Sequence, residues 1–206
     1  MTQLLTPWTI RDRAFVWGQQ TYLMGILNVT PDSFSDGGQF DRVETAIAQA
    51  QALIQAGADI LDIGGQSTRP NAATVTLETE LDRVVPVITA IRQESDIPIS
   101  VDTTRAAVAE AAIAAGADII NDISGATYEP EILTVAAARQ VPIILMHIRG
   151  TPKTMQQLTD YGDLLGDIRA FLQQQIAAAI AAGVAPGQIA IDPGIGFAKT
   201  VEQNIE

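Results

Sequence analysis

The feature that most constrains this fold is a short motif that occurs twice, at the same place in a repeated unit. Residues 56–60 read Ala-Gly-Ala-Asp-Ile, and the same five residue types recur at 115–119. In both copies a glycine ends an alanine-rich helical pattern, and an apolar run follows directly. A looser copy, Ala182 and Gly183, precedes a later apolar run. The chain therefore repeats a unit of strand, polar loop, helix and glycine turn.

Apolar runs predict six strands, near residues 22–28, 59–63, 98–102, 118–122, 142–147 and 189–192. Helical periodicity separates them, and the first helix is expected to begin at Asp41. Strands that alternate with helices predict right-handed βαβ connections and a parallel sheet. Residues 8–20 alternate around a polar centre, which predicts a hairpin that plugs one end of the fold.

The positions of polar residues favour a closed barrel over an open sheet. A barrel collects side chains from the carboxyl end of every strand, whereas an open sheet binds ligands at one switch point. No Gly-x-Gly-x-x-Gly follows the first strand, so a dinucleotide site is unsupported. Each predicted strand ends in a residue of this kind: Asn28, Asp62, Asp102, Asn121, His147 and Asp192.

We therefore predict an α/β fold, a TIM (β/α)8-type barrel with strands 1 to 6 present and an N-terminal hairpin plug. A single domain is expected to span residues 1–206. Such a barrel needs about two more βα units, so we expect the chain to be C-terminally incomplete. The last residues, from Val201, are expected to begin a helix.

Composition excludes several classes of protein. The 24 acidic residues outnumber the 12 basic ones, which argues against a nucleic-acid partner. No apolar run approaches the roughly 20 residues that cross a bilayer, and no signal peptide is evident. Without cysteine there is no disulfide framework and no thiolate chemistry. A cytoplasmic protein is expected, in which a metal, an arginine or helix N-termini would meet any anionic substrate.

The candidate residues each have a structural alternative. Asn28 could cap its own loop. Arg69 could be a surface residue, although its planar fork suits a phosphate. The strand-end carboxylates and amide could cap helices, or could accept N–H donors from a flat heterocycle. His147, the single histidine, has no evident partner, so we predict a structural residue at the rim.

Residues 24–38, Met-Gly-Ile-Leu-Asn-Val-Thr-Pro-Asp-Ser-Phe-Ser-Asp-Gly-Gly, resemble the signature of the dihydropteroate synthases, the folate-pathway enzymes that sulfonamides target. The resemblance extends to about residue 200 through several motifs in order. It implies condensation of 6-hydroxymethyl-7,8-dihydropterin diphosphate with p-aminobenzoate, giving 7,8-dihydropteroate and pyrophosphate. Gln66 departs from the pattern, because Glu is usual there.

The resemblance also implies roles for individual residues. Asn28 would ligate the cofactor Mg²⁺, and Asp102 and Arg69 would be catalytic. A mobile first loop would close over the site, with Asp32, Ser33, Phe34, Ser35 and Asp36. The pterin would contact Asp102, Asn121, Met146 and Asp192. The diphosphate and p-aminobenzoate would contact Thr68, Arg69, Pro70 and Phe197.

Further expectations concern partners and competing functions. The resemblance implies small-molecule substrates and a homodimer at full length, with no nucleic acid and no membrane as partner. It places a Ser-Arg-Lys-Ser segment and a later Arg and His beyond Glu206, so we expect this chain alone to be inactive. One alternative is a truncated barrel that binds pterin without turnover. Another is a pterin-dependent methyltransferase domain, which would not need residues 67–70, Ser-Thr-Arg-Pro.

Overall fold

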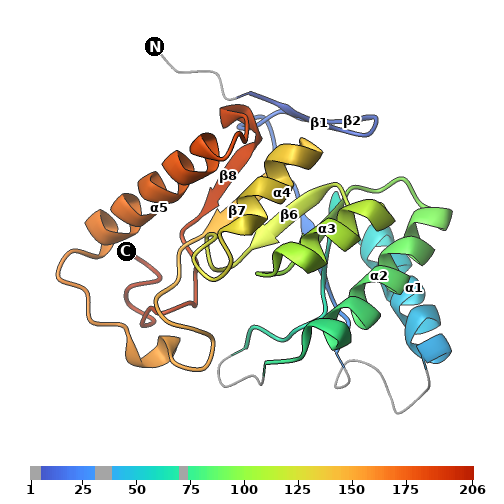
Figure 1. Ribbon diagram of the computed structural model, residues 1–206, viewed down its shortest axis with the longest axis horizontal. Helices are drawn as coiled ribbons and strands as arrows, with labels where there is room; N and C mark the ends of the chain where they lie inside the picture. Colours follow the sequence, from blue (N-terminus) through green and yellow to red (C-terminus); the bar gives the residue numbers. More distant parts are fainter. Residues whose placement is uncertain (1–5, 31–38, 70–73) are drawn as a thin grey trace.

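A computed structural model describes residues 6–30, 39–69 and 74–206, without the side chains of residues 39–42. Strands and helices alternate along most of the chain (Figure 1). The strands are β1 Trp8–Ile10, β2 Arg13–Phe15, β3 Met24–Asn28, β4 Ile60–Gly64, β5 Ile99–Asp102, β6 Ile119–Asp122, β7 Ile143–Met146 and β8 Ile189–Asp192. The helices are α1 Gln39–Gln55, α2 Leu77–Glu94, α3 Ala106–Ala115, α4 Glu131–Arg139, α5 Leu164–Ala181, and the short 3₁₀ turns η2 Met155–Gln157 and η3 Pro186–Gln188.

Strands β3 to β8 form one parallel sheet in the order of the chain. All six predicted strands are confirmed, each within two residues of its predicted bounds. Each helix packs on the next, α1 on α2 through to α4 on α5. This sequential order is that of a (β/α)8-type barrel. Within the described ranges no pairing joins β8 to β3, so these two strands are the edges of the sheet.

The two faces of the sheet differ because successive side chains of a strand point to opposite sides. Leu27, Leu61 and Val101 face the helices and lie in the main apolar cluster, fully buried. On the other face the amino-terminal end is apolar and packs under the hairpin, and the polar residues of that face are described below. Ile26, on that inner face of edge strand β3, is 62% exposed.

The repeated motif has the same structural role in both copies. Gly57 and Gly116 have φ values of +100° and +116°, which the reversal at the end of each helix requires and which L-residues disfavour. The aspartate two residues later accepts a backbone hydrogen bond from the preceding strand. Leu23 N donates to Asp59 Oδ2 at 2.8 Å, and Ile99 N donates to Asp118 Oδ2 at 2.9 Å.

The hairpin β1–β2 covers the amino-terminal ends of the strands, as predicted. Trp8, Ile10 and Phe15 form a buried cluster with Ile60 and Ile119, the first residues of β4 and β6. The hairpin lies at the end of the sheet opposite the loops that follow the strands (Figure 1). The carboxyl end is therefore the end left for a functional site.

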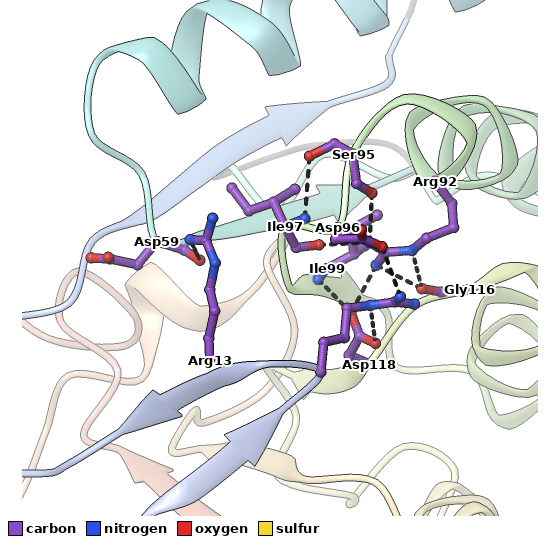
Figure 2. A network of polar contacts seen from close by, with 10 residues as sticks. Arg13, Asp59, Arg92, Ser95, Asp96, Ile97, Ile99, Gly116 and Asp118 are labelled. Carbon is purple, nitrogen blue, oxygen red and sulfur yellow. Dashed lines mark hydrogen bonds and ion pairs between the residues drawn. The ribbon is translucent and has the colours of Figure 1, made fainter.

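Arg92 closes the amino-terminal end with a dense set of hydrogen bonds (Figure 2). Its guanidinium donates to the carbonyl oxygens of Ser95, Ile97 and Gly116 at 2.8–3.0 Å. Nη2 also pairs with Asp118 Oδ2 at 2.7 Å. Arg11 of the hairpin turn donates from Nε to the other oxygen of Asp118 at 3.0 Å, so the plug is tied to the same network.

Two predicted boundaries are wrong. Helix α1 begins at Gln39, two residues before Asp41. Residues 201–205 form successive turns instead of a helix, with Asn204 N bonded to Thr200 O at 3.1 Å. No helix within the described ranges is both long and apolar enough to cross a bilayer.

Candidate active site at the carboxyl ends of the strands

A polar row crosses the inner face of the sheet on β4, β5 and β6. Asn121 Nδ2 donates to Asp62 Oδ2 at 3.0 Å, which links β6 to β4 across the intervening strand. Ser100 lies beside Asp62 in the β4–β5 ladder. Asp62 Oδ1 and Ser100 Oγ are buried and have no hydrogen-bond partner of good geometry among the described residues. Buried polar atoms left unpaired in a protein are expected to meet a ligand or water.

Asp102, the last residue of β5, lies against the end of β4. A Cβ built on Gly64 would stand 3.2 Å from Asp102 Oδ2, so the glycine leaves room for the carboxylate. Burial raises the pKa of Asp102 well above its ordinary value, and the charges of Asp62 and Glu80 raise it further. Burial also raises the pKa of Asp62, although Ser100 and Asn121 offset part of that rise. This pair of carboxyl groups therefore holds protons more readily than isolated aspartates do.

Asn28 is the last residue of β3, so it lies at the same carboxyl end of the sheet, where it pairs with Gly64 of β4. Its side chain is half-buried, and none of the described residues forms a hydrogen bond with it. The described residues contain no cluster of three or more His, Cys, Asp or Glu side chains able to hold a metal. The Asn28 side chain can offer one amide oxygen to a metal ion.

The loop after β4 places Thr68 half-buried and Arg69 exposed. Arg69 N donates to Ser67 Oγ at 3.4 Å. Gln66, the departure noted in the sequence, accepts a hydrogen bond from Val75 N at 3.2 Å. The predicted residues Asp32, Ser33, Phe34, Ser35, Asp36 and Pro70 lie outside the described part of the chain.

Met146 and Phe197 belong to one small apolar cluster at the site. Met146 is 3% exposed and packs with Ile123, Ile148 and Met155, and the half-buried Phe197 lies against this cluster. The sequence separated the two residues by 51 positions, yet the fold brings the predicted pterin and p-aminobenzoate contacts into one cluster. Asn121 and Asp62 approach one another in the same way.

Asp192 ends β8 and pairs with Met146 of β7. Its Oδ1 accepts a hydrogen bond from Gly194 N at 2.7 Å. Gly194 has φ +73°, and a Cβ there would stand 2.1 Å from the carbonyl oxygen of His147, so only glycine fits this turn. Asp192 thus has one oxygen engaged in shaping its loop.

His147 does not converge on the rim, and the prediction that all six strand-end residues do so is wrong. It follows Met146, whose side chain points inward, so alternation directs His147 to the helix side. Its ring lies edge-on to Phe171 of α5 with centroids 5.0 Å apart. The prediction of a structural role agrees with this position.

Lys199 is the partner that the sequence did not reveal for His147. The lysine is 4% exposed, and its Nζ lies 3.2 Å from His147 Nδ1. It also donates to Gly194 O at 2.9 Å and Phe197 O at 3.0 Å. Burial lowers the pKa of His147 to about 4 and that of Lys199 to about 8. Both side chains therefore hold the loop after β8 in place from outside the site.

Sequence reasoning placed Asp62 at a strand end but assigned it no role, and it missed Glu80. Glu80 lies in the first turn of the amphipathic helix α2, where a charged residue is expected to face solvent. Its side chain is nevertheless only 3% exposed. It accepts hydrogen bonds from Thr103 and Arg105, which lie more than twenty residues away. No local sequence pattern predicts hydrogen bonds between residues this far apart in the chain.

Comparison with known proteins identifies the family to which this chain belongs. The family model for pterin binding enzymes matches residues 24–206. A dihydropteroate synthase of Synechocystis sp. is 64% identical over 97% of this chain and 69% of its own length. The dihydropteroate synthase of Yersinia pestis in a sulfonamide drug complex superposes with a TM-score of 0.88 at 46% identity, over 97% of this chain and 72% of that one.

A third relative is the Xanthomonas albilineans dihydropteroate synthase with 4-aminobenzoic acid, which superposes with a TM-score of 0.88 at 41% identity. That match covers 98% of this chain and 71% of the other. The chain spans about seven tenths of the length of these relatives, which is 69%, 72% and 71% in turn. The chain belongs to the pterin-binding enzyme family and, within it, to the dihydropteroate synthases.

Proposed function

We propose that this chain forms the pterin and p-aminobenzoate sites of an enzyme that joins 6-hydroxymethyl-7,8-dihydropterin diphosphate to p-aminobenzoate. The observation that carries the proposal is the polar row on the inner face, where Asn121 is bonded to Asp62 beside Asp102. Relatives support it, because the Xanthomonas albilineans enzyme is described with 4-aminobenzoic acid and the Yersinia pestis enzyme with a sulfonamide drug.

The pterin ring would bind through acceptors that face the inner side of the sheet. Asp102, Asn121 and Asp192 would accept hydrogen bonds from its N–H groups, and Met146 would contact its apolar face. Asp62 fixes the orientation of Asn121, because the amide Nδ2 is committed to the carboxylate at 3.0 Å. The Asn121 oxygen is then the atom left to accept from the ligand.

In the reaction the C–O bond to the diphosphate breaks and a C–N bond to the aromatic amine forms. Positive charge develops on the pterin methylene as pyrophosphate leaves, and the Asp102 carboxylate stabilises it. Hydrogen bonds from ligand N–H groups favour that carboxylate, which counters the raised pKa of Asp102 in the free protein. Thr68, Arg69 and Pro70 would contact the diphosphate and p-aminobenzoate, with the Arg69 guanidinium pairing with the departing diphosphate. The attacking amine loses its proton to solvent.

Asn28 fits the requirements of a Mg²⁺ ligand. Mg²⁺ prefers oxygen ligands and keeps several waters when one or two protein groups and substrate phosphates complete its shell. A half-buried amide without a described partner supplies such an oxygen. Bound Mg²⁺ would neutralise charge on the diphosphate. Phe197 would wall the p-aminobenzoate site, and the loop with Asp32, Ser33, Phe34, Ser35 and Asp36 would cover both substrates.

The remaining parts of the proposal are broader. We assign residues 1–206 to a single domain of a cytoplasmic enzyme and expect a homodimer for the full-length protein. The competing function is a barrel that binds pterin without turnover. Turnover and binding therefore have to be measured separately.

The test supplies the pterin diphosphate, Mg²⁺ and p-aminobenzoate and measures pyrophosphate release. Release that depends on p-aminobenzoate supports the synthase, and pterin binding without release supports the binding-only function. The matched variant Asp192→Ala should lose pterin binding in a calorimetric titration. Ordinary affinity in that variant contradicts the assignment of Asp192 to the pterin site.

A further inference from the structure

The loop after β4 is held at both ends by side chains that make no proposed ligand contact. Gln66 Oε1 accepts from Val75 N at 3.2 Å, and Arg105 Nη2 donates to Val75 O at 2.6 Å. Both backbone polar groups of Val75 are thus bound by side chains. Thr68 and Arg69, which we propose bind the diphosphate, lie between these two attachment points along the chain.

Arg105 is in turn fixed by the buried carboxylate of Glu80. Nη1 of Arg105 donates to Glu80 Oε2 at 2.8 Å, and the Glu80 side chain is 3% exposed. Thr103 Oγ1 donates to the other oxygen, Oε1, at 2.6 Å. A charge-assisted pair with both carboxylate oxygens engaged holds its geometry firmly. Thr103 follows Asp102, so this pair connects the loop after β4 to the end of β5.

The start of the loop packs directly on α2. Arg83 Nη1 donates to Gly65 O at 2.8 Å. A Cβ built on Gly65 would stand 2.8 Å from Val84 Cγ2 and 3.1 Å from Glu80 O, so the backbone approaches the helix as closely as glycine allows. The loop is therefore anchored at Gly65, at Gln66 and at Val75.

We propose that Gln66 and Arg105 are positioning residues that set where Thr68 and Arg69 meet the substrate diphosphate. The inference rests on the proposed function, since it assumes that this loop binds the diphosphate. The requirement at position 66 is a hydrogen-bond acceptor for Val75 N. Glutamine and glutamate both provide one, so Gln66 keeps the contact without adding a charge to the loop.

The experiment compares two ligands in the presence of Mg²⁺ by calorimetric titration. One is 6-hydroxymethyl-7,8-dihydropterin diphosphate, and the other is the same pterin without its diphosphate. Gln66→Met removes the acceptor at similar volume. We expect it to weaken binding of the diphosphate ligand by about fivefold or more, the effect of one lost hydrogen bond. The ligand without diphosphate should bind as it does to the unaltered protein, and Gln66→Glu should preserve both affinities.

Arg105→Met tests the other attachment point. It should weaken the diphosphate ligand selectively, as Gln66→Met does. The matched control is Arg139→Met, which removes an arginine from the exposed pair with Glu110 and should change neither affinity. If Arg105→Met does not fold, Gln66→Met decides alone, because it removes no charge from a buried pair.

The outcomes separate this inference from the proposed function. Unaltered protein that binds neither ligand contradicts the proposed function and, with it, this inference. Unaltered protein that binds both, with Gln66→Met showing the same ratio of affinities, overturns the positioning role alone. Equal weakening by Gln66→Glu and Gln66→Met also overturns it, because the acceptor would then not be what matters at this position.

Discussion

Replacing His147 with asparagine should remove a loss of stability that the protein shows in mild acid. Burial and the charges of Lys199 and Arg149 lower the pKa of His147 to about 4, against 6.5 for the free side chain. Between these values the unfolded chain binds a proton that the folded chain does not, so stability falls as pH falls through this window. From pH 7.5 to pH 5 the loss is roughly 2 kcal/mol, out of about 3 kcal/mol for the whole shift.

Asparagine is the informative replacement, because its Oδ1 can take the place of Nδ1 and accept from Lys199 without titrating. Loss of the ring contact with Phe171 should cost stability equally at every pH. Urea unfolding measures the free energy of unfolding of both proteins at pH 7.5 and at pH 5. The titration of Asp62 and Asp102 affects both proteins alike, so it cancels when their losses of stability are compared. Equal losses in the two proteins between these pH values would refute the argument that His147 is buried neutral.

Other predictions concern the two ends of the sheet. Arg92→Met should lower the free energy of unfolding by about 3 kcal/mol, because it removes one cationic partner of the half-buried Asp118 and leaves the carbonyl groups of Ser95, Ile97 and Gly116 without the donor they have in the protein. Arg139→Met should change it by less than about 1 kcal/mol in the same urea titration. Gly194→Ala should destabilise by about 2 kcal/mol or more, since φ is +73° and the new Cβ clashes with a carbonyl; unchanged melting contradicts this. Asp62→Asn should lower the pKa of Asp102 by removing a like charge, which NMR titration of the carboxyl carbon measures; an unmoved midpoint contradicts it.

The sequence predicted the framework because the framework follows local rules. Apolar runs located all six strands of the sheet within two residues. The repeated Ala-Gly-Ala-Asp motif predicted two equivalent turns, and the structure adds that Asp59 and Asp118 make equivalent hydrogen bonds to the strand before them. The turn requires a residue with positive φ, and a glycine in the sequence indicates such a position directly.

The same local reasoning gave a wrong position for His147, because it did not consider which face of the sheet each strand residue points to. Met146 and His147 were both expected at the rim, but neighbouring residues of a strand point to opposite faces. The position of Met146 in the site cluster therefore directs His147 to the helices, where it meets Phe171 and Lys199. Parity could have been applied to the sequence, whereas the identity of the partner could not, because 52 residues separate His147 from Lys199.

The polar contacts of the site were beyond sequence reasoning for a further reason. Glu80 lies on a helix whose polar residues are mostly solvated, and it is buried beside Thr103 and Arg105, which follow β5. The bond between Asn121 and Asp62 similarly spans two strands. Such contacts depend on the twist and spacing of the assembled sheet, and residue types in a row do not specify these.

The polar groups at the two ends of the sheet are satisfied to different extents. At the amino-terminal end Arg92 spends its donors on carbonyl groups and Asp118, so the polar groups there are satisfied within the protein. At the carboxyl end Asp62 Oδ1 and Ser100 Oγ stay unpaired within the described chain, and the pKa of Asp102 is raised. Unpaired buried groups cost stability, and a ligand that pairs them recovers that free energy on binding. The unpaired polar atoms at the carboxyl end therefore cost stability, and a bound polar ligand or an ordered water that pairs them offsets that cost.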